Sequence, residues 1–96
     1  MIVKDDYLCS DCGNTRSCFV LNEFNMPLAL CMECYVRMKA DWARLEPASG
    51  PCMLCDIHKE NVRSFKTHSP VLFSGLRVCD TCFDKLSKLV EEGRYL

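Results

Sequence analysis

The sequence predicts a small α+β fold in which two similar units follow one another, each held together by a metal ion. Three observations carry this prediction. Eight of the nine cysteines form four Cys-x-x-Cys pairs. The pairs fall into two sets, and an apolar helical pattern follows the last pair of each set. The chain has 96 residues, so each unit is too short to fold stably on a hydrophobic core of its own.

The two sets of cysteines have the spacing of four-thiolate zinc sites. The gap between pairs is 18 residues in the first set and 23 in the second. Zinc suits tetrahedral coordination by four thiolates, and a closed site of this kind has a structural rather than a catalytic role. We therefore expect two structural zinc ions. Their predicted ligands are Cys9, Cys12, Cys31 and Cys34 in the first unit and Cys52, Cys55, Cys79 and Cys82 in the second.

Other uses of the cysteines depend on the compartment. The chain begins MIVKDDYLC, with acidic residues where a signal peptide would have an apolar run, and no apolar stretch is long enough to span a bilayer. We therefore expect a cytoplasmic, reducing location and no membrane partner. There, Cys-x-x-Cys pairs bind metal more often than they form disulfides. A disulfide framework and a redox-active pair are the alternatives, although four regularly placed pairs argue against the latter.

The first unit, residues 1–46, is expected to contain a turn, a β-hairpin and a helix in that order. Gly13 follows the second cysteine and permits the positive φ that a metal-binding turn requires. The apolar stretches 19–21 and 28–30 flank a polar segment, which predicts the hairpin. An apolar stripe at helical spacing then follows, formed by Tyr35, Met38, Trp42 and Leu45.

The second unit, residues 52–96, repeats this plan after a linker at residues 47–51, where proline and glycine stop the first helix. Asp56 replaces the turn glycine and tolerates the left-handed region. Strands at 62–66 and 71–78 are expected to form the hairpin. The matching helical stripe consists of Phe83, Leu86, Leu89 and Val90, with Gly93 as a C-terminal cap.

Charge and motifs exclude some functions. The formal net charge is −1, and eight thiolates with two zinc ions would bring the loaded protein to about −5, whereas a general DNA binder is basic. No Ser/His/Asp set, glycine-rich phosphate loop or carboxylate pair stands out, so we expect no enzyme activity. His58 and His68 are expected in loops or at the surface. Cys18 is expected to be a small buried hydrophobe in the first strand.

The first half, with Cys-x-x-Cys-Gly at residues 9–13 and a second pair that opens a helix, resembles a treble-clef zinc finger. It is similar to the N-terminal zinc-binding domain of ClpX-type protein unfoldases, and Val78 to Phe83 is similar to that domain's helix-opening motif. The resemblance covers residues 9–45 and 52–90 separately and implies the same eight cysteine ligands. It implies two tandem treble-clef fingers, each with a knuckle, a β-hairpin and a helix. The chain departs from the family in its longer second gap and in the missing second knuckle glycine, and we expect no ATPase module to follow.

Two functions follow as hypotheses. The first is a non-enzymatic interaction module, a small regulator or adaptor of a protease, an unfoldase or the transcription machinery, which two closed zinc sites, an acidic loaded charge and exposed-looking apolar residues favour. The resemblance implies the same, because the ClpX-type domain dimerises and recruits adaptor and substrate proteins. Its two units would pair within one chain or in a homodimer. The expected partner-binding residues, chosen as exposed apolar side chains, are Phe24, Met26 and Trp42.

The alternative is nucleic-acid binding through the basic hairpin of the second unit. GATA-type DNA-binding fingers have similar cysteine spacing, but the basic tail after their helix is absent here. The residues that would contact nucleic acid are Lys59, Arg63, Lys66 and Arg77. A third hypothesis is redox or metal sensing through Cys18.

Overall fold

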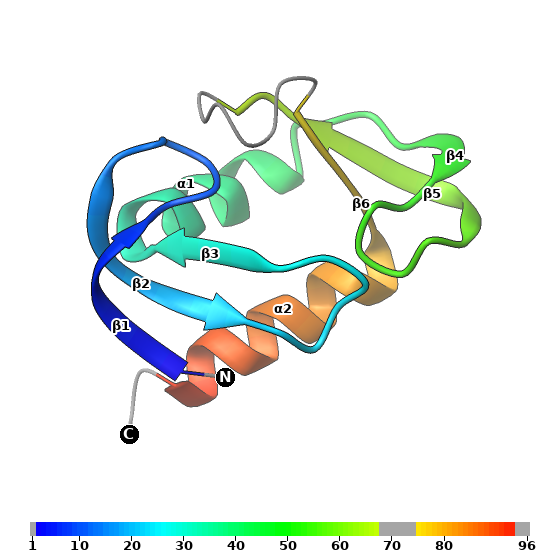
Figure 1. Cartoon of the computed structure of the whole chain (residues 1–96). Helices are drawn as coiled ribbons and strands as arrows, with labels where there is room; N and C mark the ends of the chain where they lie inside the picture. Colours follow the sequence, from blue (N-terminus) through cyan, green and yellow to red (C-terminus); the bar gives the residue numbers. More distant parts are fainter. Residues whose placement is uncertain (1, 68–74, 94–96) are drawn as a thin grey trace.

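In the part of the chain that the structure describes, two three-stranded antiparallel sheets and two helices make up the fold (Figure 1). The computed structural model describes residues 2–67 and 75–93. The first half contains β1 (Ile2–Leu8), β2 (Thr15–Leu21), β3 (Leu28–Cys31) and α1 (Met32–Trp42). The second half contains β4 (Ala48–Pro51), β5 (His58–Phe65), β6 (Leu76–Cys79) and α2 (Asp80–Gly93). The sheet orders are β1-β2-β3 and β4-β5-β6, so the predicted α+β class is confirmed, and three strands followed by a helix recur in both halves.

The sequence pattern does not predict the outer strands β1 and β4. Every residue of β1 is exposed, so no alternation of buried and exposed side chains marks it as a strand. Its pairing with β2 is interrupted between Lys4 and Tyr7, where Asp6 has a φ of +54°. Strand β4 lies within residues 47–51, which the sequence analysis takes as a linker, and pairs antiparallel with β5. Each half therefore has a third strand at the edge of its predicted hairpin.

The hairpins themselves have equivalent registers in the two halves. Cys18 of β2 lies opposite Cys31 of β3, and Val62 of β5 lies opposite Cys79 of β6. Strand β5 begins four residues before the predicted start at 62. The predicted tip of the second hairpin, with His68, and the first part of its predicted second strand lie outside the described residues.

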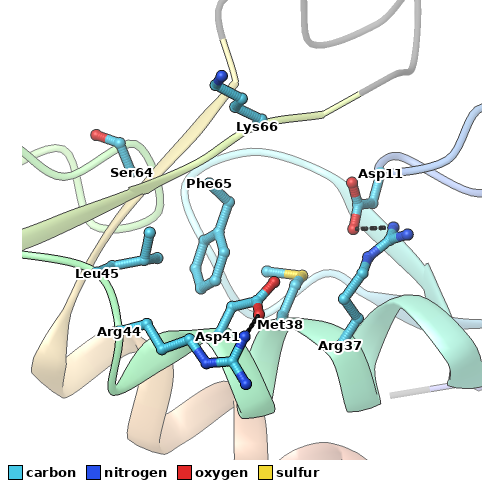
Figure 2. A pocket seen from close by; sticks show the side chains of 9 residues that line it. All are labelled: Asp11, Arg37, Met38, Asp41, Arg44, Leu45, Ser64, Phe65 and Lys66. Atoms are coloured by element: carbon cyan, nitrogen blue, oxygen red, sulfur yellow. Dashed lines mark hydrogen bonds and ion pairs between the residues drawn. The ribbon is translucent and has the colours of Figure 1, made fainter.

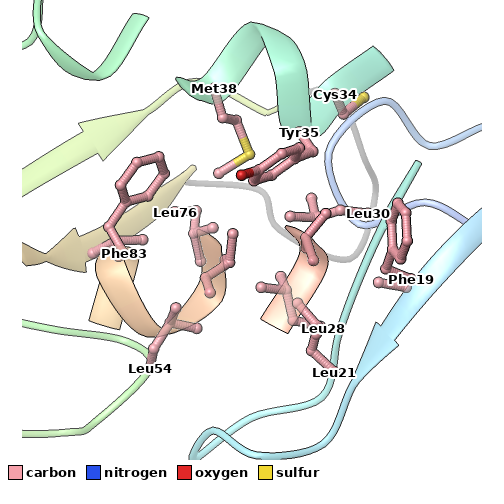
Figure 3. Packing of buried hydrophobic residues seen from close by; sticks show 14 of the residues in the cluster. Phe19, Leu21, Leu28, Leu30, Cys34, Tyr35, Met38, Leu54, Leu76 and Phe83 are labelled. Atoms are coloured by element: carbon pink, nitrogen blue, oxygen red, sulfur yellow. The ribbon is translucent and has the colours of Figure 1, made fainter. Parts of the chain in front are cut away.

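One hydrophobic core joins the two halves. In Figure 3, Tyr35 and Met38 of α1 lie across from Leu76 of β6 and Phe83 of α2. The largest fully buried side chains come from both halves and include Leu21, Leu28, Leu30, Tyr35, Leu54, Leu76, Leu86 and Val90. Because the apolar faces of both helices pack into this cluster, neither half depends on the small core that it could form alone.

An aromatic stack closes the junction between the halves. The ring of Trp42, at the end of α1, lies parallel to the ring of Phe83 with centroids 4.0 Å apart and planes 3° apart. The Arg63 guanidinium lies 4.8 Å from the centroid of the Trp42 ring, and its Nη1 donates to the Trp42 carbonyl oxygen at 2.6 Å. Nearer the start of α1, the Tyr35 hydroxyl donates to Oε1 of Glu91 at 3.1 Å. The first helix is thus tied to both β5 and α2.

Gly75 immediately precedes β6 in a conformation that other residues rarely adopt. Its φ is +88°, and a Cβ added there would collide with the carbonyl oxygen of Phe65. We expect Gly75→Ala to lower the free energy of unfolding by about 2–4 kcal/mol, because backbone strain and the collision act together. Chemical denaturation of the metal-loaded protein measures this effect. Gly50→Ala is the matched control, since nothing lies within 4 Å of a Cβ at Gly50, and equal denaturation midpoints for the two variants would contradict the prediction.

Candidate metal centres

The structure brings the eight predicted ligands together in two groups of four. In each group all the sulfur atoms lie within 4.8 Å of one another. A tetrahedral zinc ion with Zn–S bonds of about 2.3 Å requires sulfurs about 3.8 Å apart, and Cys55 Sγ lies 3.9 Å from Cys79 Sγ. We call these groups the first tetrad (Cys9, Cys12, Cys31, Cys34) and the second tetrad (Cys52, Cys55, Cys79, Cys82). Each tetrad could hold one metal ion.

A tight turn positions the first pair of each tetrad. The Gly13 N–H donates to the Cys9 carbonyl oxygen at 3.0 Å, and the Asp56 N–H donates to the Cys52 carbonyl oxygen at 2.9 Å. Gly13 has a φ of +75° and Asp56 a φ of +56°, so both residues adopt the left-handed conformation that the sequence analysis expects at this place. The turn directs the two sulfurs of the pair toward the same point.

The end of a strand and the start of a helix position the second pair. Cys31 and Cys79 end β3 and β6, while Cys34 and Cys82 lie in the first turns of α1 and α2. The backbone N–H of Cys31 donates to the Cys9 sulfur at 3.5 Å. In the second tetrad, the backbone N–H of Cys79 donates to the Cys52 sulfur at 3.4 Å. Helix N-terminal N–H groups also favour thiolates, so the backbone of both tetrads is arranged around negatively charged sulfur.

The cysteines within each tetrad differ in their readiness to ionise. Burial acts to raise the pKa of Cys9 and of Cys52, but backbone N–H groups around each sulfur outweigh it and lower both pKa values to about 7. Burial raises the pKa of Cys34 and of Cys82, and the neighbouring cysteines add to this effect. Burial thus favours the neutral form of the helix-end cysteines, and a cation at the centre would stabilise their thiolate form.

Cys18 lies beside the first tetrad without belonging to it. Its side chain is fully buried, and its Sγ donates to the Tyr7 carbonyl oxygen at 3.3 Å. Its position in the sheet, opposite Cys31, is the position that Val62 occupies in the second half, opposite Cys79. Because a valine fills the equivalent place, this observation supports the prediction that Cys18 serves as a small buried hydrophobe.

Cys18 is expected to react slowly with alkylating reagents. Burial raises its pKa to about 11, with the negative charges of Cys9 and Cys31 contributing. At pH 7.5 its thiolate fraction is then on the order of 100-fold smaller than that of an unperturbed cysteine. We expect iodoacetamide to modify Cys18 at least about 100-fold more slowly than a free cysteine while metal remains bound. Mass spectrometry of the alkylated peptides measures the rate, and fast modification with metal retained would favour the sensing hypothesis instead.

The three residues expected to bind a partner lie in three different environments. Phe24 is half-buried, with Lys85 Nζ 5.2 Å from its ring centroid. Met26 lines a surface hollow of about 420 Å³ beside β1, together with Tyr7 and Leu8. Trp42 is half-buried in the aromatic stack between the two halves. Among these residues, Met26 is the one that borders exposed apolar surface.

The basic residues of the second half also have separate environments. Lys59 is half-buried on β5, and Arg63 lies against the Trp42 ring. Arg77 is exposed on β6. Lys66 lines a hollow of about 480 Å³ at the junction of the halves, which Figure 2 shows from close by. Two cations of the first half, which the sequence analysis does not single out, also line this hollow: Arg37 and Arg44.

Comparison of the chain with protein-family models, with curated proteins and with solved structures gives no match. The resemblance to the ClpX-type zinc-binding domain therefore stays a prediction from motif spacing. In the part of the chain that the structure describes, no helix has the length and apolar character needed to cross a membrane.

Proposed function

We propose that the protein is a non-enzymatic zinc-binding module that recognises a protein partner, with two treble-clef fingers whose zinc ions hold the fold. Zinc is the metal that four thiolates at tetrahedral spacing favour. Four protein ligands close the coordination sphere, so neither ion would have a position for water or substrate. The metal centres thus support a structural role, and recognition belongs to the protein surface.

The observation that carries partner recognition is the apolar surface along β1. Six large hydrophobic residues of the described chain are exposed, and four of them lie on this one strand: Ile2, Val3, Tyr7 and Leu8, with exposed fractions of 37–52%. The hollow that Met26 and Pro27 line lies directly beside Tyr7 and Leu8. Exposed apolar side chains concentrated on one edge strand, beside a hollow, are typical of a surface that a partner covers. We therefore place the partner on β1 and this hollow.

Substitution of the β1 surface tests this function. The double variant Tyr7→Ser, Leu8→Ser is compared with a control, Val36→Ser with Ile57→Ser, which removes the two exposed hydrophobic residues away from β1. We expect the wild type and the control to capture the same protein from a lysate of the source cells. The β1 variant should recover at least about tenfold less of it, because 1.4 kcal/mol of lost binding energy suffices for that change. Two bound zinc ions in all three proteins would show intact folds, and equal capture by all three would count against the proposal.

The junction hollow supports nucleic-acid binding as a second candidate. Arg37, Arg44 and Lys66 line it together with Phe65, and this group of cations suits the phosphates of a single strand (Figure 2). Arg37 is paired with Asp11 at 3.2 Å and Arg44 lies 3.8 Å from Asp41, which reduces the charge available to phosphate.

Fluorescence anisotropy with a labelled single-stranded oligonucleotide at low salt tests this candidate. Phosphate contacts strengthen as salt falls, so binding should appear first under these conditions. Lys66→Gln should weaken it, whereas Lys88→Gln, which removes an exposed lysine from outside the hollow, should not. An oligonucleotide that stays free at low salt would exclude the candidate.

A further inference from the structure

The two metal centres differ in the side chains that surround them. In the first, Arg37 lies one helical turn after Cys34, and its Nη2 donates to Cys34 Sγ at 3.4 Å and to Asp11 Oδ2 at 3.2 Å. Figure 2 shows the pair that Arg37 forms with Asp11. Asp11 comes from the turn between Cys9 and Cys12 and is 3% exposed. One guanidinium therefore joins a ligand sulfur to a buried carboxylate.

The second centre has no such arrangement. Lys85 is the counterpart of Arg37, three residues after Cys82, but its Nζ donates to the Glu23 carbonyl oxygen at 3.0 Å and not to a sulfur. Leu54 takes the place of Asp11 between the first two ligands and is buried. Within residues 2–67 and 75–93, no cationic side chain donates a hydrogen bond to a sulfur of the second tetrad. The second centre therefore serves as an internal control for the role of Arg37 at the first centre.

We propose that Arg37 is a positioning residue that protects the first metal centre, so that the first ion is released more slowly than the second. The inference rests on the proposed zinc binding. A zinc ion with four thiolates carries a net charge of −2, and the carboxylate of Asp11 adds to the negative charge nearby. The Arg37 hydrogen bond withdraws charge from the Cys34 sulfur. It therefore slows attack on that sulfur by an electrophile and favours its staying on the metal.

The hydrogen bonding of Asp11 predicts how a double variant should behave if Arg37 has this role. Its Oδ2 is held by Arg37, while its Oδ1 has no hydrogen-bond partner in the described structure. Removing the guanidinium alone leaves a buried carboxylate without a cation beside a doubly negative centre, which weakens the site. Removing the carboxylate as well relieves that repulsion. The double variant Asp11→Asn, Arg37→Met should therefore hold the first ion better than Arg37→Met does. If the two substitutions only removed independent packing, their effects would add, and the double variant would hold the ion less well than Arg37→Met.

Site-specific zinc release tests the proposal. Zinc-loaded proteins, with two ions confirmed by native mass spectrometry, are challenged with EDTA and N-ethylmaleimide. Peptide mapping at early times then gives an initial labelling rate for each tetrad, before loss of one ion can loosen the other half. In the wild type we expect the second tetrad to be labelled about tenfold faster than the first. Arg37→Met should speed labelling of the first tetrad by about 10–100-fold without changing the second. The double variant should recover part of this loss, and the matched control Lys85→Met should leave the first tetrad unchanged.

A spectroscopic readout separates this role from general destabilisation. With ¹¹³Cd in both sites, loss of the N–H···S bond in Arg37→Met should shift one of the two cadmium resonances and leave the other in place. If Arg37→Met fails to retain two ions, Arg37→Lys serves instead. It keeps the charge but loses the planar donor, so the same resonance should shift. Equal labelling of the two tetrads in the wild type, equal acceleration of both by Arg37→Met, or a double variant worse than the single one would overturn the proposal. A chain that binds no zinc would overturn the proposed function itself.

Discussion

Removal of both metal ions is expected to unfold the whole chain. A structural zinc ion contributes on the order of 10–16 kcal/mol of apparent folding free energy at pH 7, whereas a domain of this size has a total stability of about 5–15 kcal/mol. Each tetrad ties a turn, a strand end and a helix start together, and the core packs against both helices. The metal-free chain would therefore have to pair its strands without the contacts that fix them.

Circular dichroism during titration with a strong chelator measures this effect. The signal should fall to that of an unfolded chain and return on addition of zinc. The same chelator already saturated with zinc is the control and should change nothing. A metal-free protein that keeps its secondary structure and dispersed amide resonances would show that the core alone is sufficient.

Variants that disable one tetrad test the same prediction further, because the two halves share one hydrophobic core. Cys34→Ser and Cys82→Ser each disable one tetrad, and either substitution should loosen both halves rather than one. Amide hydrogen exchange resolves the two halves. We expect protection to fall in β5 of Cys34→Ser and in β2 of Cys82→Ser, across the junction from the lost site. Exchange that changes only in the mutated half would indicate two independent units.

The sequence predicts the metal ligands and the main elements because their signals are local. Paired cysteines, the left-handed residues Gly13 and Asp56 and the apolar stripes of both helices can each be recognised within a short window. Strand β1 has no such signal, since all its residues are exposed, and β4 lies in a segment whose proline and glycine indicate a linker. Both strands form because a hairpin edge is available to pair with them, which is a tertiary effect.

The surroundings of the site depend on contacts between residues distant in sequence, which no motif records. In the sequence, Arg63 is one of several basic residues in a predicted hairpin. In the fold, it lies against Trp42 from the other half. Asp11 and Arg37 are 26 positions apart and meet only because the turn and α1 converge on one tetrad. When each half is considered alone, Trp42 is predicted to be exposed, because a unit of that size offers little core to cover an indole.

Trp42→Ala is expected to produce the second large effect. Its ring stacks on Phe83, lies 5.7 Å from the centroid of Phe65 and carries the Arg63 guanidinium on it. Loss of a large aromatic side chain from such packing costs about 3–5 kcal/mol. Denaturation of the metal-loaded protein measures the loss. Val36→Ala, an exposed position on the same helix, is the control and should change stability by no more than about 0.5 kcal/mol.

A double-mutant cycle with Phe83→Ala assigns the effect to the junction. Direct stacking predicts a coupling free energy of about 0.5–1.5 kcal/mol between the two positions. Both tetrads lie outside the stack, so two bound ions should be retained in native mass spectra of each variant. If Trp42→Ala proved as stable as Val36→Ala but lost the partner, the indole would belong to the recognition surface. If it loses stability and keeps the partner, recognition stays with β1 and Trp42 serves to hold the two halves together.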